Sequence, residues 1–288
     1  MLPNLVIIGA MKCATTSLHA YLGLHPEIAM SGRKELDFFV ENQNWQRGVA
    51  WYASQFSADA TVRGEASPRY TIRSLDAGVA DRMHVVIPDA SLIYLVRDPI
   101  DRIVSQYMHS VASGTETRPV DLAVEPRLEN DYVSRGRYHW QLEPYLDRFD
   151  VRRILVVKQD DLRRNRDETL RRVFQFVGVA EDVPADRFAF EVHTSSGKVQ
   201  GNSMTRAIES LAMTSHFGWV PRRVQQQLRR IILPALSRSI QPPILSIDLR
   251  RRLADLFRPD LERLHSLTGL SFDNWCVTDL NPEVPAPS

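Results

Sequence analysis

The segment that most constrains the fold is a short apolar run near the start of the chain, followed by a glycine and a hydroxyl-rich loop. Leu5 to Ile8 is uninterrupted and mostly β-branched, which is typical of a strand buried on both faces. The run ends at Gly9, and residues 15–24 have helical character. A strand, a glycine turn and a helix in this order predict the opening of an α/β fold.

Later segments repeat this order. Two more buried-strand candidates, each followed by a helical pattern, lie at residues 92–96 (helix 99–111) and 154–157 (helix 161–177). Further helices are expected over residues 45–56, 135–149, 204–217 and 249–264, with Pro259 kinking the last or starting a new one. We therefore predict a single α/β domain over residues 1–280, with a central, mostly parallel sheet flanked by helices. Residues 281–288 are expected to form a flexible tail, and residues 113–130 a loop or lid.

Charge and cysteine content exclude several classes of protein. The 288 residues include 36 Lys plus Arg and 35 Asp plus Glu, and the formal net charge of +1 argues against a dedicated nucleic-acid-binding protein. Two cysteines, Cys13 and Cys276, are too few for a disulfide framework or a zinc site, so we expect no metal. The sequence shows no signal peptide and no apolar stretch of about 18 residues, so we expect a cytoplasmic protein without a transmembrane segment.

The loop after the first strand combines groups that bind a phosphate. It reads Gly-Ala-Met-Lys-Cys-Ala-Thr-Thr-Ser over residues 9–17. The backbone N–H groups of such a turn, including those of Cys13 and Ala14, and the N-terminus of the following helix can converge on an anion. Lys12 adds a full positive charge, and hydroxyl donors come from Thr15, Thr16 and Ser17. The alternative is an ordinary strand-to-helix loop in which Thr16 or Ser17 caps the helix.

This loop differs from the P-loop of nucleoside-triphosphate enzymes, Gly-x-x-x-x-Gly-Lys-Ser/Thr, although both join a strand to a helix. Counted from Gly9, Ala14 stands at the second glycine position and Thr15 at the lysine position, whereas the lysine of this chain is Lys12.

A second phosphate-binding candidate follows the strand at residues 92–96. Arg97 stands where that strand ends, and its guanidinium can form a forked contact with a phosphate. Ser105 follows about two helical turns later and can face the same crevice. Asp98 and Pro99 form an ordinary helix start. Further along, Tyr138 is interpreted either as a nucleotide contact or as a core residue.

Both segments resemble the motifs of sulfotransferases that use 3′-phosphoadenosine 5′-phosphosulfate (PAPS). Residues 12–18 resemble the loop that binds the 5′-phosphosulfate, and residues 97–107 resemble the 3′-phosphate motif Arg-Asp/Asn-Pro-x-x-Arg-x-x-Ser-x-Tyr. Residues 32–39 resemble the Lys-Glu-x-x-x-Phe-Phe run of heparan-sulfate-type and bacterial members, one residue shorter, with Glu35 in the position of the usual base. Residues 65–70 resemble the Glu-x-Ser/Thr-Pro-x-Tyr turn, which is expected to shape the acceptor side.

One family feature is not intact. Heparan-sulfate enzymes grip the nucleotide with a late Lys-Gly-Arg loop, and the corresponding stretch here is residues 195–203. The resemblance leaves Lys198 or Arg206 as candidates for that contact. The histidines match no motif position.

The resemblance implies in-line transfer of the sulfuryl group from PAPS to a hydroxyl or amine of a carbohydrate, glycolipid or small metabolite. It places Lys12 at the bridging oxygen and Glu35 as the base, with Tyr138 near the nucleotide. It also implies a bacterial, cytoplasmic enzyme that needs no metal. A sulfuryl group carries less charge than a phosphoryl group, so a lysine and backbone donors can replace the magnesium ion that phosphoryl transfer uses. Two alternatives stay open from the sequence: a P-loop nucleotide kinase or phosphotransferase, and a non-catalytic nucleotide-binding module with the same fold.

Overall fold

The computed structural model describes residues 1–57, 59–190, 199–200, 238–239 and 241–277. Its centre is a five-stranded sheet in the order β2-β3-β1-β4-β5, and all its pairings are parallel. The strands are β1 (Leu5–Gly9), β2 (Ile28–Met30), β3 (Val62–Ala66), β4 (Ser91–Val96) and β5 (Ile154–Lys158). The predicted α/β class with a parallel sheet is confirmed.

The two strands that carry the sequence signal lie inside the sheet. Residues 5–8 of β1 and 92–96 of β4 are fully buried, because helices cover both faces of a parallel sheet. β2 and β3 were not predicted. β3 contains Arg63, Gly64 and Glu65 rather than an apolar run, and β2 has three residues, so β3 lacks the composition and β2 the length of a predicted buried strand.

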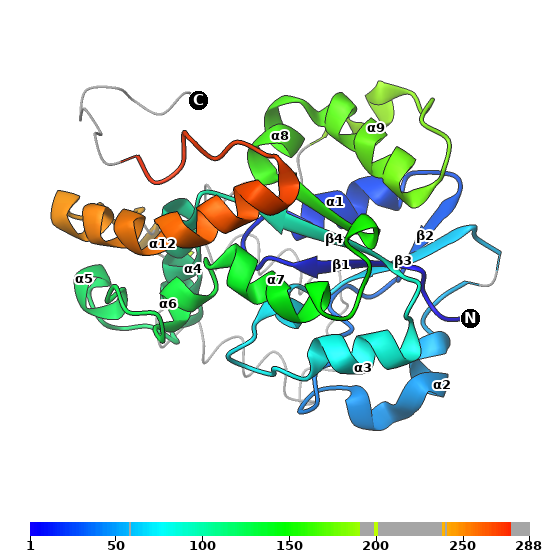
Figure 1. Cartoon of the computed structure of the whole chain (residues 1–288), viewed down its shortest axis with the longest axis horizontal. Helices are drawn as coiled ribbons and strands as arrows, with labels where there is room; N and C mark the ends of the chain where they lie inside the picture. Colours follow the sequence, from blue (N-terminus) through cyan, green and yellow to red (C-terminus); the bar gives the residue numbers. More distant parts are fainter. Residues whose placement is uncertain (58, 191–198, 201–237, 240, 278–288) are drawn as a thin grey trace, which may run out of the picture.

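Helices cover both faces of the sheet. Figure 1 shows α1 (Thr15–Leu22), α8 (Gln159–Arg164) and α9 (Arg166–Val177) on one side, and α3 (Val79–Val86) and α7 (Tyr138–Leu146) on the other. The long helix α12 (Ile247–Thr268) packs against α7 and α4 (Pro99–Ser113). The remaining short elements are α2 (Gly48–Ala53), α5 (Val120–Ala123), α6 (Asp131–Ser134), η1 (Trp45–Arg47), η2 (Pro68–Thr71), η3 (Val151–Arg153), η4 (Ala185–Phe188), β6 (Val199–Gln200) and β7 (Arg238–Ser239).

Several predicted helices are shorter or interrupted. The helix expected over 161–177 is divided at Asn165, whose backbone leaves the helical region (φ −125°, ψ 50°) and separates α8 from α9. The helix expected over 45–56 becomes η1 followed by α2, because Gly48 adopts a left-handed φ of 78°. Pro259 lies within the single helix α12, so the alternative of a new helix starting there was wrong.

Parts of the prediction fall outside the described residues. These are the helix expected over 204–217, the tail over 281–288, and the two late nucleotide-contact candidates, Lys198 and Arg206. Among the residues that the structure describes, no helix is long and apolar enough to cross a membrane.

Candidate functional site

The carboxyl ends of β3, β1 and β4 bring three loops to one edge of the sheet. These strands are adjacent and parallel, about 5 Å apart, so the segments that follow them emerge side by side. The Ala10 N–H donates to the Leu95 carbonyl at 2.7 Å, and the Ser67 N–H donates to the Ile7 carbonyl at 3.1 Å. Ligands of open α/β sheets bind at this edge.

The loop between β1 and α1 is built as a turn over a helix N-terminus. Lys12 and Ala14 have positive φ values of 73° and 63°, which bend the chain sharply before the helix. Ala14 is the N-cap of α1 and makes no side-chain cap hydrogen bond. The alternative in which Thr16 or Ser17 caps this helix was therefore wrong, and the partial positive charge at this helix end is available to an anion. At Gly9, an added Cβ would collide with Thr71 Oγ1, so the strand end requires glycine.

Two predicted cofactor contacts in this region have buried side chains. Cys13 is fully buried, its N–H donates to the Ala10 carbonyl at 3.2 Å, and burial raises the pKa of its thiol to about 11. Tyr138 is also fully buried. Its hydroxyl donates to the Arg97 carbonyl at 2.6 Å and lies 3.7 Å from Cys13 Sγ. The ring thus belongs to the core, the second of its two predicted interpretations, and its hydroxyl joins the segments that follow β1 and β4.

The segment after β4 places a cation at the same edge. Arg97 keeps 22% of its side chain exposed, and its guanidinium lies 3.5 Å from Asp101 Oδ2. Asp98 caps α4 as predicted, accepting hydrogen bonds from the Ile100 and Asp101 N–H groups. Ser105 lies on the buried face of α4. Its contact with a phosphate stays a prediction.

Arg102, in the same motif, is structural. It is fully buried, donates to Gln106 Oε1 at 2.7 Å and to the Tyr132 carbonyl, and burial lowers its pKa. These contacts tie α4 to α6.

The loop that carries Glu35 runs along the end of β3. The Glu35 N–H donates to the Ala66 carbonyl at 3.0 Å, and the Glu35 side chain is 52% exposed. Its carboxylate accepts a hydrogen bond from Lys34 Nζ at 2.6 Å. Glu35 has a φ of 62°, in the left-handed region. The side chain therefore points out of the core on the β3 side of the phosphate loop.

Two further titratable groups, which sequence reasoning did not select, lie beside Glu35 and Lys34. Asp37 is almost fully buried; burial raises its pKa, against the opposing charge of Arg69, whose Nε lies 3.0 Å from Asp37 Oδ2. His19, one turn into α1, has its pKa lowered by burial and by the charge of Lys34. His19 approaches the loop only through the tertiary fold, and Asp37, two positions after Glu35 in the loop itself, is buried beside Arg69 only in the folded chain, so local spacing gave no signal for either.

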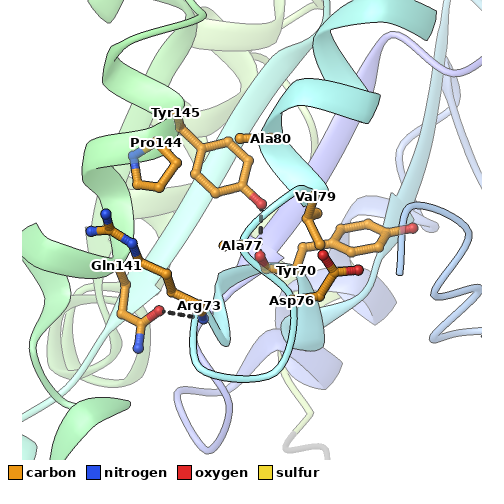
Figure 2. A pocket seen from close by; sticks show the side chains of 9 residues that line it. All are labelled: Tyr70, Arg73, Asp76, Ala77, Val79, Ala80, Gln141, Pro144 and Tyr145. Carbon is orange, nitrogen blue, oxygen red and sulfur yellow. Dashed lines mark hydrogen bonds between the residues drawn. The ribbon is translucent and has the colours of Figure 1, made fainter. Parts of the chain in front are cut away.

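No group of three His, Cys, Asp or Glu residues that could hold a metal ion occurs within the described part of the chain. A small pocket lies between η2, α3 and α7 (Figure 2). None of its lining residues is a predicted catalytic or cofactor-binding residue, and one of them, Tyr70, ends the turn at residues 65–70. The lining residues are Tyr70, Arg73, Asp76, Ala77, Val79, Ala80, Gln141, Pro144 and Tyr145.

Comparison with known proteins matches residues 2–219 to the sulfotransferase domain family. The bifunctional heparan sulfate N-deacetylase/N-sulfotransferase 1 of Caenorhabditis briggsae is 28% identical over 67% of this chain and 24% of its own length. The heparan sulfate glucosamine 3-O-sulfotransferase 6 of Homo sapiens is 26% identical over 94% of this chain and 73% of its own length. The first curated relatives are thus much longer than the segment they share with this chain.

Among solved structures, the sulfotransferase from Alicyclobacillus acidocaldarius is similar over nearly the whole chain. The two structures superpose with a TM-score of 0.67 at 25% sequence identity. The match covers 96% of this chain and 99% of the Alicyclobacillus acidocaldarius chain.

Proposed function

Because the chain belongs to the sulfotransferase family, we propose that it transfers a sulfuryl group from PAPS to a hydroxyl or amine acceptor and releases adenosine 3′,5′-bisphosphate. One observation carries the proposal. The adjacent strands β3, β1 and β4 end beside Glu35, Lys12 and Arg97 respectively, so a carboxylate, a central lysine and a second cation follow in this order along one edge of the sheet.

The donor set at this edge fits PAPS, which carries anionic groups at the 3′ and 5′ positions of its ribose. The turn at residues 12–14 and the first turn of α1, with Thr15, Thr16 and Ser17, would hold the 5′-phosphosulfate. Arg97, with Ser105 in the following helix, would hold the 3′-phosphate. PAPS supplies the activated sulfuryl group. The nucleotide contact that the family makes through its late loop is assigned here to Lys198 or Arg206, and this assignment stays a prediction.

The chain's own residues then have distinct roles. In this proposal, Lys12 neutralises the negative charge that grows on the bridging oxygen as the sulfur–oxygen bond breaks. Glu35 accepts the proton that the attacking hydroxyl or amine loses as its bond to sulfur forms. Lys34 Nζ donates a hydrogen bond to the Glu35 carboxylate at 2.6 Å. These roles require no metal ion.

The acceptor is proposed as a carbohydrate, a glycolipid or a small metabolite. Two of the curated relatives act on heparan sulfate according to their names, which makes a sugar hydroxyl or amine the first acceptor to test. The Glu35 side chain is half exposed, so a large acceptor can approach it. The cytoplasm of a bacterium, as the place of this reaction, stays a prediction.

The proposal is tested by following adenosine 3′,5′-bisphosphate released from PAPS in the presence of glycan and small-molecule acceptors. We expect Glu35→Gln to lose most turnover while it binds adenosine 3′,5′-bisphosphate as the wild type does. Glu41→Gln is the matched control, because Glu41 is an exposed carboxylate that lies six positions further along the chain. Near-full turnover by Glu35→Gln rejects the base assignment, and phosphoryl transfer from ATP in place of sulfuryl transfer rejects the proposed reaction.

A further inference from the structure

A buried carboxylate lies directly beneath the loop that carries Glu35. Glu65, in β3, is fully buried and accepts three short hydrogen bonds from hydroxyl groups. They come from Tyr52 at 2.6 Å, Ser67 at 2.6 Å and Tyr70 at 2.7 Å. Burial raises the pKa of Glu65, and the hydroxyl donors act against that rise. Burying a carboxylate costs free energy unless hydrogen bonds satisfy it, and here three hydroxyl groups do so. Such an arrangement suggests that the buried Glu65 has a role in the fold or the site.

Two of these hydroxyls also hold the backbone of the loop. The Asp37 N–H donates to Ser67 Oγ at 3.0 Å, and the Phe38 N–H donates to the Tyr70 hydroxyl at 2.9 Å. A hydroxyl has one proton and can accept through its lone pairs. Because the Ser67 and Tyr70 hydroxyls each donate their one proton to a hydrogen bond with the Glu65 carboxylate, both hydroxyl oxygens face the loop as acceptors. Glu65 thereby fixes the orientation of the groups on which the loop rests.

The loop needs such support because its backbone is strained. Glu35 and Asp37 have φ values of 62° and 46°, in the region that residues other than glycine rarely adopt. Strain of this kind persists where the surrounding contacts determine the conformation. Here the contacts are the Glu35 N–H to the Ala66 carbonyl and the two hydrogen bonds to Ser67 and Tyr70.

The support is itself fixed to the rest of the domain. The Tyr145 hydroxyl donates to the Tyr70 carbonyl at 2.8 Å, and the Arg73 N–H donates to Gln141 Oε1 at 2.9 Å, which holds η2 and the residues after it on α7 (Figure 2). The backbone of Tyr70 is thus attached to a core helix while its hydroxyl contacts the loop. A rigid support of this kind can locate a reacting group precisely enough for catalysis.

We propose that Glu65 is a positioning residue: by orienting the Ser67 and Tyr70 hydroxyls, it holds the loop in the conformation that places the Glu35 carboxylate beside the phosphate loop. This rests on the proposed role of Glu35. The chain offers a matched pair for the test, because Tyr52 and Tyr70 each donate one hydrogen bond to Glu65, and both are buried. Of the two hydroxyls, the one on Tyr70 contacts the loop backbone.

The test compares Tyr70→Phe with Tyr52→Phe in the full chain. Both substitutions keep the aromatic ring and remove one Glu65 hydrogen bond. We expect Tyr70→Phe to lower kcat by about 10- to 100-fold with the KM for PAPS unchanged, and Tyr52→Phe to stay within about 2-fold of the wild type. Glu65→Gln should behave like Tyr70→Phe, because an amide cannot accept from all three hydroxyls. Equal kcat values for the two tyrosine variants overturn the proposal.

A second readout does not depend on the reaction. Amide hydrogen exchange at Phe38 should become faster in Tyr70→Phe and stay at the wild-type rate in Tyr52→Phe. Unchanged exchange in Tyr70→Phe overturns the positioning role even if kcat falls. If the wild type transfers no sulfuryl group from PAPS, the proposed function fails, and the exchange rates still decide whether Glu65 and its hydroxyls hold the loop.

Discussion

Replacing Arg97 by alanine should weaken the binding of adenosine 3′,5′-bisphosphate while leaving the binding of adenosine 5′-monophosphate nearly unchanged. In the structure, the Tyr138 hydroxyl holds the Arg97 backbone: it accepts a hydrogen bond from the Arg97 N–H at 3.3 Å and donates one to the Arg97 carbonyl at 2.6 Å. Those contacts survive the substitution. The change therefore removes the guanidinium and leaves the strand end in place.

The magnitude follows from what the guanidinium contacts. Its partner in the unliganded chain is Asp101 Oδ2 at 3.5 Å, and Asp101 is 56% exposed, so this ion pair contributes about 0–1 kcal/mol to folding. A charge-assisted hydrogen bond to a 3′-phosphate contributes about 1.5–3 kcal/mol. We therefore expect roughly a 10- to 150-fold loss of affinity for the bisphosphate with little change in folding stability.

The assay is calorimetric titration of wild type and Arg97→Ala with each nucleotide, together with urea unfolding of both proteins. Arg153→Ala is the control, since Arg153 directly precedes β5, at the opposite end of the sheet, and pairs with Asp89 at 3.0 Å. An equal loss of affinity for both nucleotides would place Arg97 away from the 3′-phosphate. No loss for either nucleotide would remove it from the binding site.

Further predictions concern stability and its pH dependence. Asp260 accepts hydrogen bonds from the His139 and Trp140 N–H groups, both at 2.9 Å, and so caps α7 from α12; Asp260→Ala should lower the free energy of unfolding by about 1–2 kcal/mol in urea, against less than about 0.5 kcal/mol for the exposed Asp255→Ala. Equal effects of these two substitutions contradict the capping role. Because burial raises the pKa of Glu65 above 4.5, the folded chain binds a proton there more tightly than the unfolded chain. The stability of the wild type relative to Glu65→Gln should therefore fall as the pH rises from about 4.5 through that raised pKa, and a difference in urea midpoint that is constant from about pH 4 to 7 argues against it. With its buried, high-pKa thiol, Cys13 should react with iodoacetamide only after unfolding; labelling of the native chain at Cys13, read by peptide mass spectrometry, contradicts this.

The central part of the fold could be predicted because its signal is local. β1 and β4 are continuous apolar runs, and Gly9 and Asp98 mark where the chain leaves them. β3 could not be found this way. Its Glu65 is polar in sequence and buried in the structure, where three hydroxyls satisfy it, so the strand has no apolar pattern.

The candidate site shows the same division. Lys12, Glu35 and Arg97 belong to linear motifs, and the topology then brings the three segments to one edge of the sheet. The neighbourhood of Asp37 and His19 depends on how the loop folds over the end of β3 and against α1, which no local spacing expresses. The Tyr138 ring matched a motif position, and only the structure shows that its hydroxyl contacts Arg97 from within the core.

We propose above all that this edge of the sheet binds the PAPS nucleotide. Calorimetric titration with adenosine 3′,5′-bisphosphate, with and without Mg²⁺, tests it most directly because no acceptor is needed. We predict one nucleotide bound per chain, equally tightly with and without Mg²⁺, and much weaker binding of ATP with Mg²⁺. Tight binding of ATP with Mg²⁺ together with no binding of adenosine 3′,5′-bisphosphate would contradict the account.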